Sequence, residues 1–134
     1  MIRCKRIYLA AEADDGRRVL VDRLWPRGIA RDALDLHDWL PDVAPSTTLR
    51  KAFGHRPEAF DAFRIAYRQE LAGHPEHWQA LLQWATQGRL TLLYAARDER
   101  CNNAQVLAEF LEDELERQAA PSSPVCYLGD FDAD

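Results

Sequence analysis

The sequence predicts an α/β fold, a single compact domain in which a small, mostly parallel sheet is flanked by about four helices. Apolar runs typical of strands, such as Leu90–Ala95, are separated by segments whose apolar residues recur every three or four positions, as on one face of a helix. Strands that alternate with helices form parallel sheets covered by helices. A chain of 134 residues is also of the size typical of one domain.

Two strands are expected near the N-terminus. Ile7–Ala10 is short and apolar, Asp14–Gly16 is typical of a turn, and Val19–Leu24 is the second strand. If strands joined by so short a connection pair with each other, they are antiparallel, because a parallel crossover needs about a dozen or more residues.

Two short helices are expected next. The apolar residues between Leu34 and Leu40 indicate a helix that ends at Pro41, since proline does not continue a helix. Ser46 is a typical N-cap for a helix over Thr47–Phe53, because its hydroxyl accepts a hydrogen bond from a free amide.

Two further helices precede the central strand. Pro57 and Glu58 mark the start of the first. His74–Glu76 marks the start of the second, which Gly88 ends. Their inward faces are expected to carry Phe60, Phe63, Tyr67 and Leu71 in the first helix, and Trp78, Leu81, Leu82 and Ala85 in the second.

Leu90–Ala95 is expected to be the central strand, because a near-continuous apolar run is typical of a strand buried on both faces. We assign residues 1–118 to the domain and residues 119–134 to a linker and C-terminal tail, in which Val125–Leu128 forms an edge strand or packs loosely. The last helix of the domain follows the central strand, and its apolar face carries Ala104, Leu107, Leu111 and Leu115.

Composition places the protein among soluble globular domains of the cytoplasm. No stretch approaches the roughly 20 apolar residues of a membrane span, and the N-terminal residues lack the apolar region of a secretory signal. Cys4, Cys101 and Cys126 are odd in number and lack metal-type spacing, so free thiols are expected. The histidines show no metal pattern either, and neither a metal nor another cofactor is predicted.

The charge distribution favours a small anionic ligand. The net charge of −5 argues against binding to the nucleic-acid backbone, where a basic surface supplies most of the affinity. Arginines are nevertheless frequent between Arg17 and Arg56, whereas Glu109–Glu116 is acidic. A local basic site on an acidic protein fits a small anion better than a long polyanion. The alternative is that the asymmetry reflects only solvated faces.

The first candidate site is the run Leu20–Gly28, where an apolar strand ends in charged residues. Ligand sites of open α/β sheets lie beyond the carboxyl ends of strands. Arginine suits anions because its guanidinium stays charged and donates two parallel hydrogen bonds. We predict that Arg23 and Arg27 bind an anion beside Trp25, with Asp22 as a general base. Alternatively, Asp22 and Arg23 form a salt bridge and Trp25 fills the core.

The second candidate site lies between the central strand and the following helix, whose N-terminal amides attract anions. Arg97 is predicted to bind the anion and Tyr94 to donate a hydrogen bond. Asp98 is a second candidate base or a helix cap, and Asn102 contacts the anion or caps the helix. Cys101 is a weaker candidate, as a nucleophile activated by the helix N-terminus.

The third candidate site surrounds Ser46 and Arg50. Ser46 either contacts the anion or caps the helix, and Arg50 is a further cationic contact. His55, a few residues later, is a candidate proton carrier because histidine titrates near neutral pH. A lone histidine is more often a surface or packing residue.

Four segments together resemble the DUF488 family, specifically its YeaO-like branch. They are VDRLWPRG, APSTTLRKAFGH, FRIAYRQEL and TLLYAARDERCNNAQVL, and the resemblance runs from about Ile7 to Leu115. It implies a compact α/β domain of bacterial, cytoplasmic type whose biochemical function is not established. The polar positions that recur in the family fall on Asp22, Arg23, Arg27, Ser46, Arg50, Tyr94 and Asp98.

One departure from the family pattern bears on catalysis. Where relatives are expected to have histidine followed by asparagine, this chain has Cys101 and Asn102. If that histidine is an indispensable catalyst, its absence argues against an enzymatic role here.

Three functions are open at this stage. The leading one is an enzyme, or an enzyme-derived domain, that acts on a small phosphate- or nucleotide-bearing substrate held by arginines. The alternative is a non-catalytic module that binds a small anion or single-stranded nucleic acid, with Trp25 and Arg27 stacked on a base. The third is an interaction protein that uses the acidic helix Glu109–Arg117. No membrane contact and no particular oligomeric state are predicted.

Overall fold

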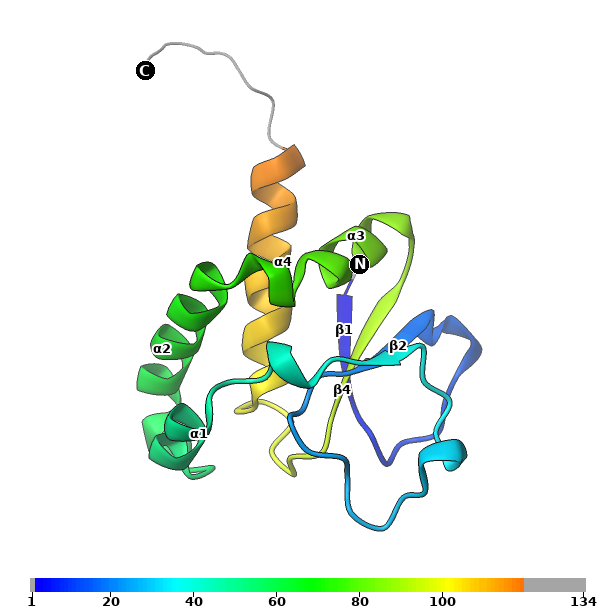
Figure 1. The fold of residues 1–134 in the computed structure, drawn as a ribbon, viewed down its shortest axis with the longest axis horizontal. Coiled ribbons are helices and arrows are strands. Elements are labelled where there is room, and N and C mark those ends of the chain that lie inside the picture. Colours follow the sequence, from blue (N-terminus) through cyan, green and yellow to red (C-terminus); the bar gives the residue numbers. More distant parts are fainter. Residues whose placement is uncertain (1, 120–134) are drawn as a thin grey trace.

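The protein, described here as a computed structural model of residues 2–119, is an α/β domain with a four-stranded parallel sheet (Figure 1). The strand order is β1-β4-β2-β3, which confirms the predicted fold class. The strands are β1 (Ile2–Arg6), β2 (Arg17–Leu20), β3 (Asp38–Trp39) and β4 (Leu90–Tyr94). Ala119, predicted to begin the linker, is still part of the last helix, and the rest of the predicted linker and tail, with the predicted strand Val125–Leu128, lies outside the described residues.

The central strand is β4, as predicted. It pairs in parallel with β1 on one side and with β2 on the other, so that Leu92 lies opposite both Cys4 and Val19. Every residue of β4 is buried, which is why four of its five residues are apolar.

The prediction for the first strand is wrong in position. β1 covers Ile2–Arg6 rather than Ile7–Ala10, because charged side chains point from it into an ion-pair cluster and hide its strand pattern. β1 and β2 do not pair with each other, since β4 lies between them, and all three strands are parallel. The β2 ladder ends at Leu20 instead of Leu24, although the Val21 amide still donates to the Leu93 carbonyl at 3.1 Å.

The four helices agree with the sequence prediction. They are α1 (Thr47–Phe53), α2 (Phe60–Gly73), α3 (Gln79–Gln87) and α4 (Asn103–Ala119). Ser46 caps α1, because its hydroxyl accepts a hydrogen bond from the Leu49 amide at 3.2 Å. The helices cover one face of the sheet and enclose the larger core cluster with the apolar side chains of β2 and β4 (Figure 1). No helix among residues 2–119 combines the length and the apolar character needed to cross a bilayer.

The other face of the sheet is covered by loops. Leu20 and Leu93 form a second, smaller core with Ile7. The residues packed over it come mainly from the segment between β2 and β3: Trp25, Ile29, Leu34, Leu36 and Trp39, with Ala95.

The helix predicted between Leu34 and Leu40 is therefore wrong. A 3-10 turn covers only Arg31–Ala33, and the chain then runs beside β2 in extended form. The His37 and Leu40 amides donate to carbonyls of β2 at 2.7 and 2.9 Å. Backbone hydrogen bonds to β2 thus outweigh the helix-like spacing of the apolar residues between Leu34 and Leu40.

An ion-pair cluster, defined as Arg3, Lys5, Asp15 and Arg18, lies on this second face. Asp15 is fully buried and accepts hydrogen bonds from Arg18 at 2.5 Å, from Lys5 at 3.1 Å and from Arg3 at 3.1 Å. The Thr91 hydroxyl of β4 donates to the Asp15 carbonyl at 2.6 Å. The cluster thereby connects β1, β4 and the start of β2.

Candidate functional site

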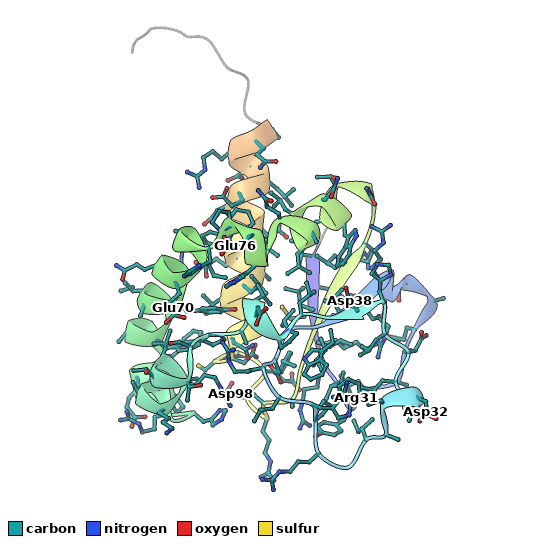
Figure 2. The ribbon with its side chains drawn as sticks, viewed as in Figure 1. Arg31, Asp32, Asp38, Glu70, Glu76 and Asp98 are labelled. Carbon is teal, nitrogen blue, oxygen red and sulfur yellow. The ribbon has the colours of Figure 1, made fainter. Side chains whose placement is uncertain are left out.

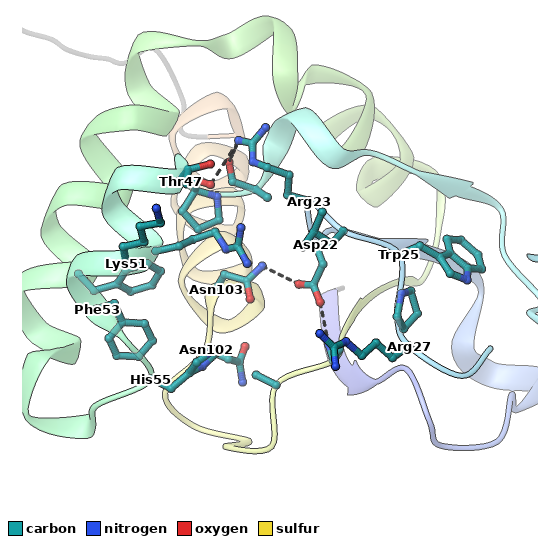
Figure 3. A pocket seen from close by; sticks show the side chains of 18 of the residues that line it. Asp22, Arg23, Trp25, Arg27, Thr47, Lys51, Phe53, His55, Asn102 and Asn103 are labelled. Atoms are coloured by element: carbon teal, nitrogen blue, oxygen red, sulfur yellow. Dashed lines mark hydrogen bonds between the residues drawn. The ribbon is translucent and has the colours of Figure 1, made fainter. Parts of the chain in front are cut away.

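A cavity of about 510 Å³ opens beyond the carboxyl ends of β2 and β4 (Figure 3). Its walls come from the loop after β2, the α1 region and the residues on either side of the loop between β4 and α4. Cavities of this size commonly accept small molecules, and this position is the usual ligand site of open α/β sheets.

Seven of the residues singled out from the sequence line this cavity, and five do not. Those that line it are Asp22, Arg23, Trp25, Arg27, Arg50, His55 and Asn102. Those that do not are Ser46, Tyr94, Arg97, Asp98 and Cys101.

Asp22 lies at the centre of the site, where the chain leaves β2. One carboxylate oxygen accepts a hydrogen bond from the Ala95 amide at 2.9 Å, and the other accepts one from Asn103 Nδ2 at 3.1 Å (Figure 3). Burial raises the pKa of Asp22, while these two hydrogen bonds and the nearby Arg50 and His55 act to lower it. The carboxylate is thus held rigidly between the β4 loop and α4.

Four cations line the same cavity, and we call Arg23, Arg27, Arg50 and Lys51 the pocket cations. Within residues 2–119, none of them has a carboxylate oxygen at ion-pair distance. Their positive charge is therefore not balanced by a direct protein partner in the described part of the chain. An anion that entered the cavity would meet the guanidinium groups of Arg27 and Arg50 and the ammonium group of Lys51.

Arg23 has a structural contact as well as a place in the cavity wall. Its guanidinium donates to the carbonyls of Ala44 and Pro45, both at 3.3 Å. Its Nε is buried and has no hydrogen-bond partner in the described residues. A buried donor without a partner is costly.

His55 reaches the cavity from a backbone conformation that is rare for its residue type. Gly54 and His55 both have left-handed φ values, 56° and 58°. Glycine adopts this region freely, whereas a residue with a Cβ is strained there, and such strain is frequent at functional sites. Of the three wall residues His55, Lys51 and Asn103, only His55 was predicted as a site residue, and the folded chain shows that all three share this cavity.

Trp25 borders the cavity, but its ring serves the second core. The ring packs edge-on against Trp39 at 5.4 Å, and the indole N–H donates to the Ile29 carbonyl at 2.7 Å. The Arg31 guanidinium lies over both rings, at 5.1 Å from Trp25 and 4.8 Å from Trp39. The Trp39 N–H in turn donates to the Asp22 carbonyl at 2.8 Å and fixes the backbone of the site.

The residues of the second predicted site have mainly structural contacts. Tyr94 is buried, and burial raises its pKa. Asp98 lies in the loop before α4 (Figure 2), where it accepts hydrogen bonds from the Arg100 and Cys101 amides, which lower its pKa. Arg97 is exposed.

Asn102 and Cys101 close the loop before α4. Asn102 caps the helix, because its carbonyl oxygen accepts a hydrogen bond from the Gln105 amide at 3.0 Å, while its Nδ2 donates to the Asp98 carbonyl at 2.8 Å. Burial and the negative charge of Asp98 raise the pKa of Cys101. A raised pKa keeps the thiol protonated, which is the opposite of what a nucleophile needs.

Ser46 belongs to a neighbouring cavity of about 260 Å³ on the other side of Arg23 and Ala44. Its hydroxyl and amide both donate to the Glu70 carboxylate, at 2.6 and 3.0 Å. Ser46 therefore joins α1 to α2.

The cavity wall also includes residues that were not predicted from the sequence as site residues. Tyr8 and Phe63 both line the cavity, and the Tyr8 hydroxyl donates to the Arg27 carbonyl at 3.4 Å. Phe63 follows the helical spacing of a core residue, and no local pattern distinguishes it from its neighbours on α2.

Comparisons with known proteins identify relatives. Over residues 1–128 the sequence matches the family profile described as "Inactive DUF488-N3 subclade". It is 47% identical over 110 residues to the uncharacterized protein YeaO of Escherichia coli (strain K12), covering 82% of this chain and 96% of YeaO. It is 43% identical over 112 residues to the uncharacterized proteins Mb3100c of Mycobacterium bovis and Rv3073c of Mycobacterium tuberculosis, covering 82% of this chain and 92% of each. No solved structure matches.

Proposed function

The chain belongs to the DUF488 family, in its YeaO-like branch, and we propose that its main cavity binds a small phosphate-bearing molecule without transforming it. The observation that carries this proposal is the set of four pocket cations without an ion-pair partner among residues 2–119, gathered around about 510 Å³ of space. Guanidinium groups bind phosphate through paired, charge-assisted hydrogen bonds.

The cavity also suits the remainder of such a ligand. Phe53 and Phe63 are buried aromatic residues of its wall, and their rings stack on each other at 4.5 Å. Pro26 and Ala95 add further apolar surface. Binding sites for small molecules typically combine apolar walls with a few convergent polar groups. A ligand in which a phosphate is attached to a flat ring, as in a nucleotide, would match both the pocket cations and the apolar wall.

Three observations favour binding over catalysis. Both oxygens of Asp22 accept hydrogen bonds from the protein, and the other candidate catalytic residues, Tyr94 and Asp98, do not line the cavity. The raised pKa of Cys101 disfavours a thiolate. The word "Inactive" in the description of the matching family agrees with this proposal.

The test is calorimetric titration of the protein with inorganic phosphate and with a nucleoside monophosphate, at fixed low salt. Arg50→Ala is expected to weaken binding roughly 10- to 100-fold, because a hydrogen bond to a charged group contributes about 1.5–3 kcal/mol. The matched control is Arg97→Ala, which removes an exposed arginine that lies outside the cavity wall and leaves affinity unchanged. Equal losses in both variants, or no binding by the wild type, would reject the proposal.

A catalytic role for Asp22 is the second candidate, favoured by its burial and raised pKa. Asp22→Asn separates the two functions. If the cavity only binds, removing its negative charge strengthens phosphate binding; if Asp22 is a general base, the variant loses turnover of any substrate found. A salt-dependent shift of single-stranded DNA or RNA in a gel would instead favour a nucleic-acid ligand.

A further inference from the structure

We propose a second ligand site, at which His74, Glu76 and His77 bind one divalent ion of a late transition metal such as Zn²⁺ or Ni²⁺. The three residues follow the end of α2, where Figure 2 labels Glu76, and one ligand atom from each lies within 4.8 Å of the others. Two imidazoles and one carboxylate form a donor set that these metals prefer.

The separations of the donor atoms suit a single coordination sphere. Glu76 Oε2 lies 3.1 Å from His74 Nδ1 and 3.7 Å from His77 Nε2. In a tetrahedral zinc site with metal–ligand bonds of about 2.1 Å, neighbouring donor atoms are about 3.4 Å apart. The two observed distances lie on either side of this value, and binding requires the two stacked imidazole rings to turn so that both lone pairs point at the ion.

A 3-10 turn brings the two histidines together. The turn covers Pro75–His77 and begins directly after His74. Side chains three residues apart eclipse each other in a 3-10 helix, whereas they diverge in extended chain. The two imidazole rings accordingly stack at 4.9 Å between centroids with an 11° angle between planes. Sequence spacing alone predicted no metal because His74-Pro75-Glu76-His77 is not a familiar metal motif.

The backbone of the turn is already fixed. The His77 amide donates to the His74 carbonyl at 3.0 Å, and the Trp78 amide donates to the Pro75 carbonyl at 3.1 Å. Trp78 is buried and its indole N–H donates to the Leu71 carbonyl at 2.7 Å. A turn anchored in this way presents its ligands without a large loss of conformational entropy on binding.

The surroundings leave room for the ion. His74 and His77 line the smaller cavity, whose exposed Asp42 adds negative charge. Arg23 also lines this cavity, but its guanidinium donates to backbone carbonyls. Glu70 is already engaged by Ser46.

The acidic group Glu12, Asp14 and Asp15 is a useful contrast. Its carboxylates are already paired with the cations of the ion-pair cluster, at distances of 2.5 to 3.2 Å for the hydrogen bonds that hold them. A metal ion there would have to displace them, whereas at His74 the competing charges are few.

The experiment is calorimetric titration of tag-free, reduced protein with Zn²⁺ and with Ni²⁺. We expect one ion per chain, and the double variant His74→Ala/His77→Ala should lose more than about 100-fold in affinity, since losing even an outer partner of a metal ligand costs about 10–100-fold. Glu76→Gln should weaken binding less. The control His37→Ala removes an exposed histidine far from the turn in sequence and should bind as the wild type does.

Ni²⁺ also broadens nuclear magnetic resonance signals near its site, which locates the ion independently of affinity. Broadening centred on the amides of residues 74–78 supports the proposal. Broadening centred on Cys4 or Cys101, unchanged affinity in the double variant, or no ion bound by the wild type overturns it. Circular dichroism of each variant verifies that the exposed substitutions leave the fold intact.

Discussion

The ion-pair cluster and the pocket cations are both rich in positive charge, yet they use it differently. In the cluster, Asp15 is fully buried and every cation has a carboxylate partner. Around the cavity, Arg50 and Lys51 are exposed, and no described residue supplies them with a carboxylate at ion-pair distance.

The difference separates stabilising charges from charges available to a ligand. A buried pair contributes through the large penalty of breaking it, since the remaining charge is then left uncompensated. An unpaired cation at a cavity contributes little to the folded state but retains its hydrogen-bonding capacity for an incoming anion. Mutations in the two regions should therefore affect different measurements.

The largest expected effect is on the folding of the cluster. Asp15→Asn should lower the free energy of unfolding by about 3–5 kcal/mol, because Lys5 and Arg18 then remain buried without their counter-charge. Urea denaturation followed by circular dichroism measures the change. The matched control is Asp14→Asn, whose carboxylate is exposed and paired with Arg3. If Asp15→Asn lowered the free energy of unfolding by less than about 1 kcal/mol, the ion-pair cluster would not be a stabilising group distinct from the pocket cations.

The cluster should also make stability depend on acid pH. Burial raises the pKa of Asp15, but hydrogen bonds from the Glu12 amide, Arg18 and Lys5 outweigh it and hold the pKa at about 2, below the ordinary 3.8. A lowered pKa contributes stability that is complete above the ordinary value and is lost as the pH falls from about 4 through 2. Melting temperatures between pH 6 and pH 2 should fall less steeply in Asp15→Asn than in the wild type.

A smaller effect is expected at the buried hydroxyl of β4. Thr91→Val keeps the shape of the side chain but removes the hydrogen bond to the Asp15 carbonyl. The free energy of unfolding should fall by about 1–2 kcal/mol, since one buried acceptor loses its partner. An unchanged free energy of unfolding would mean that water reaches the carbonyl and that the cluster is less enclosed than the burial of Asp15 and Thr91 indicates.

The smallest effect on folding is expected for the pocket cations. Arg27→Ala and Arg50→Ala should each change the free energy of unfolding by less than about 0.5 kcal/mol, because both residues are exposed and lack an ion-pair partner among the described residues. Arg23→Ala should cost more, since its guanidinium donates to two carbonyls. If Arg50→Ala lowered the free energy of unfolding substantially, the pocket cations would stabilise the fold as the ion-pair cluster does, and the comparison would fail.

The helices and the central strand could be predicted because their patterns are local. The spacing of Phe63, Tyr67 and Leu71 places one face of α2 in the core, and β4 is apolar at four of its five residues. Likewise, the run that ends β2 indicated a site, because the carboxyl ends of strands are where α/β sheets bind ligands.

The remaining features depend on partners distant in sequence. In the sequence alone, three charged residues of the N-terminal strands resemble surface residues: Arg3, Lys5 and Arg18. The structure shows that all three form ion pairs with the buried Asp15. The two-residue β3 exists because its neighbours donate to β2 carbonyls, which no apolar spacing records. In the site, only the folded structure shows that His55 lines the cavity and that Arg97 does not.

The place of β4 at the centre of the sheet has a consequence for synthesis of the chain. β4 pairs with both β1 and β2, yet it begins at Leu90, after three of the four helices. As the polypeptide leaves the ribosome, β1 has no strand partner and β2 has only β3 until β4 is made. Contacts so far apart in sequence slow folding and leave strand edges open to aggregation meanwhile. The four-stranded sheet is therefore completed only after the three helices between β3 and β4 have been made.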